Sequence, residues 1–171
     1  MNSTNKLVEE IRQRFEIIDV IHPDDQQVIL DIDKMHLHTL LSHLKADGFR
    51  QLSLLSAVDW IKDNIFELVY IVFNWDTGVH VLARVKLPRD NPRFRTITPI
   101  YPGAQYYERD VHEFFGIEFE GNPMSYKPLF LELWDEMPPM RKDFDPEAYS
   151  REKFPERVYV PHFVPKVEVI E

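Results

Sequence analysis

The feature that most constrains the fold of this chain is an amphipathic helix that passes directly into an extended segment. Four apolar residues fall at i, i+4, i+7 and i+8 and so form one stripe of a helix: Tyr107, Val111, Phe114 and Phe115. The rest of the circumference is polar, with Glu108, Arg109, His112 and Glu113. Gly116 stands where a helix can end in the left-handed conformation, which costs least for a residue without Cβ. We expect the protein to act through this helix and the segment behind it.

The residues before this helix predict an α+β fold. A first helix is indicated by Leu7, Val8, Ile11 and Phe15, with Ser3, Thr4 or Asn5 as its cap. Residues 15–21 and 27–32 read as a hairpin around the turn His22-Pro23-Asp24-Asp25. Asp33 is expected to cap a second helix that ends at Gly48, and its buried face carries Leu37, Leu40, Leu41 and Leu44.

Three longer strands follow, at residues 49–60, 65–75 and 79–87, with turns at 62–64 and 76–78. The order is therefore helix, two strands, helix, three strands. This order predicts a mostly antiparallel sheet with helices covering one face. The helix containing Glu108 comes after this sheet, as a docking helix, and an irregular extended tail follows it.

The tail is distinguished by proline and aromatic residues. Residues 122–171 hold eight of the 13 prolines and no glycine, yet large apolar side chains run through them. A disordered linker would be poorer in aromatic residues. We therefore divide the chain into an α/β domain at 1–121, which includes the signature helix, and a tail at 122–171. The tail is expected to wrap on partner subunits; the alternative is that it lies back over its own sheet.

Composition excludes several classes of function. The formal net charge of −9 argues against nucleic-acid binding. With no cysteine, the chain cannot ligate an iron–sulfur cluster or a zinc ion through thiolates, and it has no thiolate nucleophile. No apolar run reaches the length of a membrane span, and the first residues do not resemble a signal peptide, so we expect a soluble, cytoplasmic protein.

The charged residues leave a few chemical alternatives open. His36, His38 and His43 are best explained as a solvated polar face, because no carboxylate lies at ligand spacing between them. Glu108 and His112, at i and i+4, could form a metal or acid–base pair in a free-standing metal-dependent hydrolase, although a third ligand is missing nearby. Arg109 and Glu113 have the spacing of an ion pair, and Arg109 could instead clamp a carboxylate on a neighbouring subunit. An unrelated regulatory binding module is a third possibility.

Two blocks of sequence resemble a known family. The first is Glu108-Arg109-Asp110-x-x-Glu113-x-Phe115-Gly116-Ile117-x-Phe119-x-Gly121-Asn122-Pro123, and the second is Pro139-Met140-Arg141-Lys142-Asp143-Phe144. They resemble the E-R-E-x-W-D-x-F-G-I-x-F-x-G-H-P and P-L-R-K-D-F signature of the 30-kDa or C-type subunit of respiratory complex I, NADH–quinone oxidoreductase, and of related membrane-bound hydrogenases. His112 stands where tryptophan is usual, Glu113 replaces aspartate, and the arginine pair after Gly-His-Pro is absent. These departures favour the hydrogenase-type or archaeal branch and weaken the expectation that NADH is the electron donor.

The resemblance implies a cofactor-free subunit in the peripheral arm of a membrane complex, on the cytoplasmic side of the cell membrane. It implies contact with a hydrogenase-like, 49-kDa-type large subunit and with a small cluster-bearing subunit. Iron–sulfur clusters and the nickel–iron or quinone site are then expected in those partners, and no activity is expected of the isolated chain. The residues expected to carry docking are Glu108, Arg109, Asp110, Glu113, Phe115, Gly116, Phe119, Gly121, Pro123, Arg141, Lys142 and Asp143.

Overall fold

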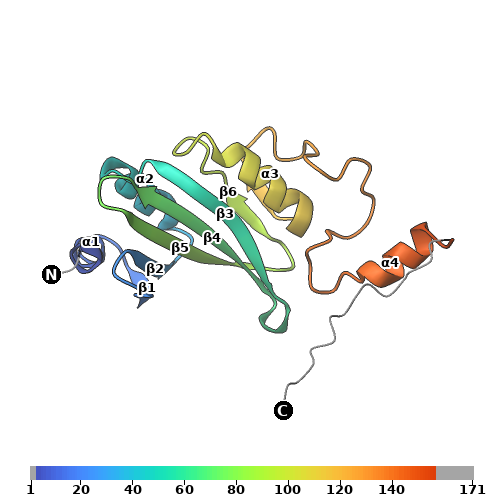
Figure 1. The fold of residues 1–171 in the computed structure, drawn as a ribbon, viewed down its shortest axis with the longest axis horizontal. Helices are drawn as coiled ribbons and strands as arrows, with labels where there is room; N and C mark the ends of the chain where they lie inside the picture. Colours follow the sequence, from blue (N-terminus) through green and yellow to red (C-terminus); the bar gives the residue numbers. More distant parts are fainter. Residues whose placement is uncertain (1–2, 157–171) are drawn as a thin grey trace, which may run out of the picture.

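A computed structural model describes residues 3–156 of the chain (Figure 1). The expected order of helix, two strands, helix and three strands is confirmed. The elements are α1 (Ser3–Arg12), β1 (Ile17–Ile21), β2 (Gln27–Ile32), α2 (Leu37–Ala46), β3 (Gln51–Trp60), a short 3₁₀ turn η1 (Ile61–Asp63), β4 (Ile65–Asn74), β5 (Val79–Pro88), β6 (Arg93–Arg95), α3 (Ala104–Phe115), β7 (Glu118–Glu120) and α4 (Pro146–Lys153). The last part of the tail, residues 157–171, lies outside the described residues.

The main sheet has five strands in the order β1-β2-β5-β4-β3. The β1–β2, β3–β4 and β4–β5 pairs are antiparallel, and β2 and β5 are parallel. The single parallel pair arises because the chain leaves β2, forms α2, and returns as the three consecutive strands β3, β4 and β5. The last of these closes against β2. The expected, mostly antiparallel sheet is therefore confirmed.

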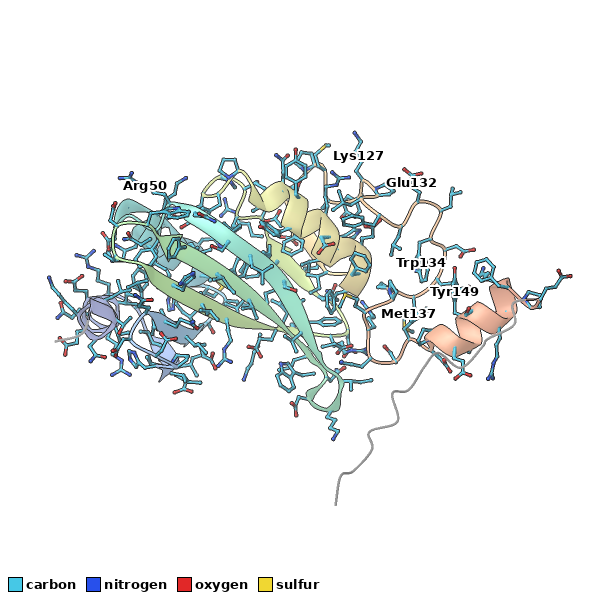
Figure 2. The ribbon with its side chains drawn as sticks, in the orientation of Figure 1. Arg50, Lys127, Glu132, Trp134, Met137 and Tyr149 are labelled. Carbon is cyan, nitrogen blue, oxygen red and sulfur yellow. The ribbon has the colours of Figure 1, made fainter. Side chains whose placement is uncertain are left out.

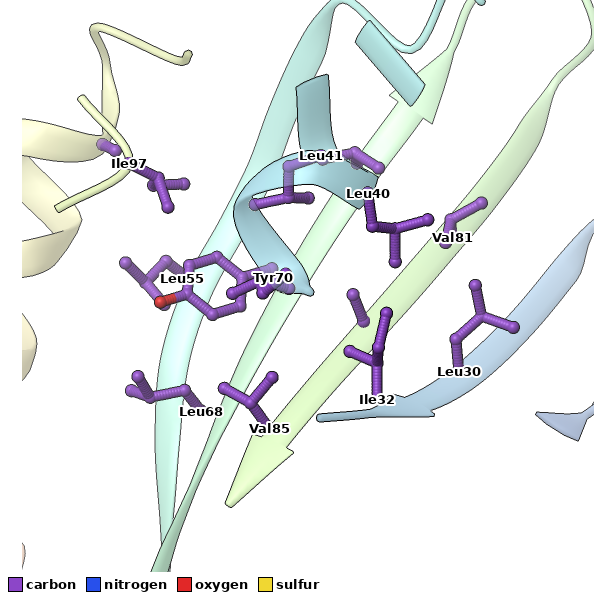
Figure 3. Close-up of a cluster of buried hydrophobic side chains, with 14 of the residues drawn as sticks. Leu30, Ile32, Leu40, Leu41, Leu55, Leu68, Tyr70, Val81, Val85 and Ile97 are labelled. Atoms are coloured by element: carbon purple, nitrogen blue, oxygen red, sulfur yellow. The ribbon is translucent and has the colours of Figure 1, made fainter. Parts of the chain in front are cut away.

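Helices α2 and α3 pack on one face of this sheet. Leu40 and Leu41 of α2 lie over Leu30 and Ile32 of β2 and over the buried residues of β5 (Figure 3). At the other end of the same face, the ring of Phe115 on α3 meets the edge of Phe66 on β4, with ring centroids 6.1 Å apart. Alternation along β4 and β5 turns every second side chain into this core, which is the pattern of a half-covered sheet.

Helix starts were predicted less well than strands. The expectation that Asp33 caps the second helix is wrong, since α2 begins at Leu37 with His36 in the capping position. The Asp33 carboxylate instead accepts the N–H of Met35 at 2.8 Å, in the turn ahead of the helix. At the first helix, α1 already begins at Ser3, so Thr4 and Asn5 lie within it.

The extended segment expected after the signature helix is present as β7, but its partner strand β6 and the helix α4 were not expected from the sequence. Strand β6 pairs in parallel with β7, with Phe94 opposite Phe119, and this pair forms a small second sheet beside α3. In the tail, which was expected to be irregular throughout, α4 forms over eight residues. Its cap is Asp145, whose carboxylate accepts the N–H groups of Glu147 and Ala148 at 3.0 Å, with Pro146 in the first turn.

Candidate partner-docking site

Glu108 lies in the interior, on the side of α3 that faces β6 and β7. Its carboxylate is fully buried and accepts three hydrogen bonds, from the Thr96 hydroxyl at 2.7 Å, the Ile97 N–H at 2.8 Å and the Asn122 amide at 2.8 Å. Burial raises the pKa of Glu108, and these three hydrogen bonds oppose the shift. One carboxylate thus joins the loop after β6, the helix and the first residue of the tail.

Arg109 and Glu113 were expected to form an ion pair, and the structure contradicts this. The Arg109 guanidinium donates to two tail carbonyls, that of Lys127 at 3.0 Å and that of Pro128 at 2.6 Å. The Glu113 carboxylate accepts backbone N–H groups at 2.7–3.1 Å from the next three tail residues, Leu129, Phe130 and Leu131. Both charged groups therefore hold the main chain of the tail, which offers carbonyls to the cation and N–H groups to the anion.

Asp110 lies between these two residues on α3 and is half-buried. Burial and the nearby Glu113 charge raise the pKa of its carboxyl group. His112 uses its ring nitrogen Nδ1 at 2.9 Å from the Ile117 carbonyl, which fixes the ring at the end of the helix, and it meets the ring of Tyr126 edge-on at 4.9 Å. Nδ1 must carry a hydrogen to make the contact with the carbonyl.

The proposed Glu108–His112 metal pair is not favoured by this geometry. Glu108 points into the interior toward Thr96, Ile97 and Asn122, whereas His112 contacts the carbonyl of Ile117 and the ring of Tyr126. Within residues 3–156, no group of three or more His, Asp or Glu side chains is placed to hold a metal ion.

The end of α3 is held by the second sequence block. Gly116 takes φ +74°, and a Cβ there would lie 2.8 Å from Nη2 of Arg141 and 3.1 Å from Cγ of Pro138. Glycine is favoured by the left-handed backbone, and its missing Cβ leaves the space that the end of the Arg141 side chain occupies. The space is used by Arg141, whose Nε donates to the Phe115 carbonyl at 2.8 Å while its guanidinium lies 5.3 Å from the Phe66 ring centre. Arg141 therefore caps the helix from the tail.

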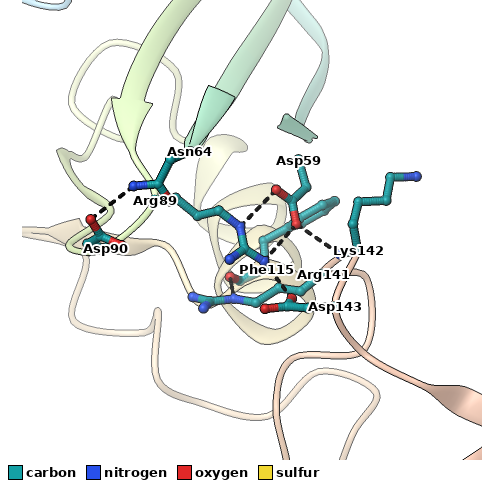
Figure 4. A network of polar contacts seen from close by, with 8 residues as sticks. All are labelled: Asp59, Asn64, Arg89, Asp90, Phe115, Arg141, Lys142 and Asp143. Carbon is teal, nitrogen blue, oxygen red and sulfur yellow. Dashed lines mark hydrogen bonds and ion pairs between the residues drawn. The ribbon is translucent and has the colours of Figure 1, made fainter. Parts of the chain in front are cut away.

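An ion network next to this cap joins the tail to the sheet (Figure 4). Arg89, just after the end of β5, donates to Asp59 on β3 at 2.9 and 3.1 Å, and its guanidinium also contacts Asp143 of the tail. Asp59 also accepts the backbone N–H of Lys142 at 2.9 Å. The hydrogen bond from Arg89 lowers the pKa of Asp143, and burial together with the Arg89 charge lowers that of Arg141.

The remaining predicted residues have local roles. Phe119 is buried in β7. Gly121 takes φ +90°, with the Thr96 methyl carbon 3.1 Å from where a Cβ would stand. Pro123 and Lys142 are exposed. The structure thus brings most of the expected residues together in three groups along α3: one around Glu108, one where Arg109 and Glu113 hold residues 127–131, and one around Phe115 and Arg141.

Residues 30–150 match the family described as "Respiratory-chain NADH dehydrogenase, 30 Kd subunit". The chain belongs to this family. As a member it is a C-type subunit of a complex I-like respiratory complex, and both signature blocks lie inside the matched range.

Individual relatives support this assignment. The C-type subunit of the F(420)H(2) dehydrogenase of Methanosarcina mazei is 33% identical over 117 residues, which are 67% of this chain and 73% of that protein. The C/D protein of the NADH-quinone oxidoreductase of Rhodopseudomonas palustris is 46% identical over 79 residues, which are 46% of this chain but only 13% of that longer protein.

A solved structure is similar over almost the whole chain. A chain in the structure of the membrane-bound sulfane sulfur reductase, described as an archaeal respiratory membrane complex, superposes with a TM-score of 0.82 at 29% identity. The match covers 98% of this chain and 99% of that one. This similarity and that to the Methanosarcina protein agree with the archaeal branch that the sequence departures favoured.

Asp59 and Arg89, which connect the family signature to the sheet, were not predicted as functional residues. Asp59 interrupts the inward-facing apolar positions of β3, and its side chain is fully buried against Arg89. An acid at an inward position of a strand is a usable signal, because a buried carboxylate requires a partner. Finding Arg89 as that partner required the tertiary fold, since the two residues are 30 positions apart.

Phe115 provides a direct test of the packing between α3 and the sheet. It is 5% exposed and contacts Phe66 across the core. We expect Phe115→Ala to lower the free energy of unfolding by about 3–5 kcal/mol, because it removes a buried ring and leaves a cavity. Urea denaturation of the purified chain measures this. A loss within about half a kcal/mol, as at a surface site, would show that the stripe does not form the contact described.

Proposed function

We propose that this chain is a cofactor-free structural and assembly subunit in the peripheral arm of a membrane-bound, complex I-like redox enzyme. In this proposal, the α/β domain and α3 form a rigid support. The tail presents the docking surface for a 49-kDa-type, hydrogenase-like large subunit and a small cluster-bearing subunit. The complex would place the chain at the cytoplasmic side of the cell membrane. Within residues 3–156, no helix has the length and apolarity to cross a bilayer.

One observation carries the proposal: the main chain of the described tail is held by polar contacts while several of its large apolar side chains face outward. Arg109, Glu113, Arg141 and Asp143 all join the tail to the domain by polar contacts. Within residues 122–156, the exposed large apolar side chains are Tyr126, Phe130, Leu133, Met137, Met140 and Phe154. Such a concentration of exposed apolar groups is expected of a surface that another protein covers.

The partner is suggested by the names of the relatives. The Rhodopseudomonas palustris relative is a C/D protein, so in that organism C-type and D-type sequences belong to one polypeptide. Covalent fusion is compatible with function only if the two parts lie close together in the assembled enzyme. We therefore propose that the tail of this chain is covered by the D-type large subunit.

Electron transfer is assigned to the partner subunits. Without cysteine the chain cannot ligate an iron–sulfur cluster through thiolates, and the buried carboxylates Glu108 and Asp59 are used in hydrogen bonds and ion pairs. Its contribution is then to position the subunits that carry the clusters and the nickel–iron or quinone site. The hydrogen, sulfur, coenzyme or quinone chemistry depends on those subunits.

The proposal is tested by substituting Arg109. Because the Lys127 and Pro128 carbonyls are at the surface, water can replace the guanidinium, and we expect Arg109→Ala to cost the isolated chain less than about 1 kcal/mol. The tail would then lose its contacts at residues 127 and 128 and be less firmly positioned, although Glu113 still holds residues 129–131. We therefore expect the yield of complex with co-expressed D-type subunit to fall at least about fivefold, since ordering this stretch on binding costs free energy.

Arg50→Ala is the matched control, because Arg50 is exposed at the opposite end of the molecule from the tail (Figure 2). It should change neither the yield nor the melting temperature. If Arg109→Ala lowers stability and complex yield in the same proportion, Arg109 has only a structural role. If the wild-type chain fails to co-purify with the D-type subunit, the proposed function is wrong.

A further inference from the structure

Leu133 has a backbone conformation that leucine rarely adopts. Its φ is +62°, and apart from glycines the only other residue between 3 and 156 with positive φ is Asn64, a residue type that tolerates it. Leu133 is the third residue of a four-residue turn closed by a hydrogen bond of 3.3 Å from the Trp134 N–H to the Leu131 carbonyl. At that position a positive φ is normally supplied by glycine or asparagine.

Within residues 3–156, packing of the Leu133 side chain does not compensate for this unfavourable backbone conformation. The Leu133 side chain is 99% exposed, more than Tyr126 or Phe130, which are 67% and 68% exposed. A strained residue persists only where its surroundings impose the strain, and such residues concentrate at functional sites. Here an unfavourable backbone holds a branched apolar side chain entirely in solvent.

The turn is fixed from both sides. On one side, the Glu113 carboxylate binds the N–H groups that end at Leu131, two residues before Leu133. On the other, the indole of Trp134 donates to the Met137 carbonyl at 3.0 Å, and its ring lies tilted against that of Tyr149 of α4 with centroids 4.8 Å apart (Figure 2). The projection of Leu133 is therefore set by the fold and needs little ordering on binding.

The surroundings indicate the chemistry of the partner surface. Glu132, Asp135 and Glu136 lie beside Leu133 in the sequence, and Lys153 of α4 contacts the last two at 3.5 and 3.7 Å. The exposed aliphatic side chain of Leu133 is therefore flanked by acidic residues, and the whole chain carries a formal net charge of −9. A complementary surface has an apolar pocket with lysine or arginine at its rim.

We propose that Leu133 is the anchor of the tail on the D-type large subunit, inserting into an apolar pocket with a basic rim. This rests on the proposed function and adds to it the residue that contributes most to binding. It also explains why leucine occupies a turn position that suits asparagine better: the side chain is used in the complex, and the strain is tolerated in the free chain.

The test uses Leu133→Asn in the full-length chain, with affinity for the purified D-type subunit and thermal unfolding as separate measurements. Asparagine accepts the left-handed conformation, so we expect the melting temperature of the free chain to rise by about 2–4 °C. Loss of the aliphatic anchor should weaken binding at least about tenfold. A change that stabilises the free chain and weakens the complex is not produced by general damage to the loop.

Two further variants sharpen the result. Leu133→Met retains apolar bulk and should bind within about threefold of wild type, whereas Glu132→Asn, a neighbouring polar change, should leave the melting temperature unchanged and affect binding only at low salt. The inference is overturned if Leu133→Asn binds as tightly as wild type, or if it lowers the melting temperature. In either case a wild-type chain that binds the D-type subunit keeps the proposed function intact, and a wild-type chain that does not bind removes both.

Discussion

Replacing Glu108 with alanine is expected to lower the free energy of unfolding by about 4–6 kcal/mol. The substitution removes the acceptor for three donors, the Thr96 hydroxyl, the Ile97 N–H and the Asn122 amide. Each buried donor left without a partner costs about 1–3 kcal/mol, and the cavity adds to this loss. Equilibrium urea denaturation of the purified chain provides the measurement. A loss of about 1 kcal/mol or less would mean that water enters and satisfies the donors, so that Glu108 is not the centre of this junction.

Glu108→Gln separates the charge of Glu108 from its hydrogen bonds. Glutamine resembles the neutral acid, so the difference in stability between wild type and this variant depends on the protonation of Glu108. Because burial raises the pKa of Glu108 above its ordinary value of 4.5, folding makes its neutral form more favourable, relative to the ionised form, than it is in the unfolded chain. Its contribution to stability is fully present below pH 4.5 and declines as pH rises through the folded pKa.

We therefore expect the stability of wild type relative to Glu108→Gln to fall as pH increases from about 4.5 through the folded pKa, and to remain constant above it. Other carboxylates titrate equally in both proteins and cancel. This includes Asp143, whose lowered pKa gives the opposite trend. The measurement is a series of urea titrations across this pH range. A relative stability that rises with pH would show that the three hydrogen bonds outweigh burial and that Glu108 is ionised in the folded state.

The strands and the faces of the helices could be predicted from the sequence because they depend on local periodicity. Val79–Pro88 alternates buried and less buried positions along its whole length, and Leu37, Leu40, Leu41 and Leu44 recur at helical spacing. These patterns show which face of a helix or strand is buried, but not which other element packs against that face. The parallel contact of β2 with β5 was not visible in this way, because it depends on the path taken after α2.

The roles of Arg109 and Glu113 show where local spacing fails. At i and i+4 the two side chains could have met, and exposed pairs of this kind are worth only about 0.2–0.5 kcal/mol. The tail offers each of them two or more backbone groups of the right polarity, which outweighs one exposed ion pair. Sequence spacing cannot reveal this competition, because the tail residues lie 16–19 positions away.

The tail itself was only partly predictable. Its prolines and aromatic residues predicted a segment that wraps on partner subunits, and this stays a prediction. Residues 122–143 contact their own helix and sheet through Asn122, Arg141 and Asp143. The tail was expected either to wrap on partner subunits or to lie back over its own sheet. One segment can do both. The main chain binds the domain, and exposed side chains such as Phe130 remain for another surface.

Removal of the tail is expected to separate these two roles and to abolish assembly. The sequence divides the chain between residues 121 and 122, but Asn122 and Ser125 are buried. The truncated chain should therefore end after Tyr126. It keeps all five strands of the main sheet, α3 and the acceptor contacts of Glu108. It loses the Arg141 cap on the Phe115 carbonyl and the contact between Arg89 and Asp143, both of which water can partly replace at the new surface.

We expect this chain of residues 1–126 to unfold cooperatively in a thermal melt as a monomer, but to fail to co-purify with the D-type subunit. The apolar side chains of Phe130, Leu133 and Met137 are absent from it, and they carry the proposed docking surface. Two longer chains serve as controls. One ends at Asp145 and retains the Arg141 and Asp143 contacts without α4, and one ends at Glu156 and omits only the segment outside the described residues. If the 1–126 chain is unfolded, residues 127–156 belong to the core of this domain and the division of roles is wrong. If it folds and still assembles normally, docking occurs elsewhere, and the exposed side of α3 becomes the surface to mutate next.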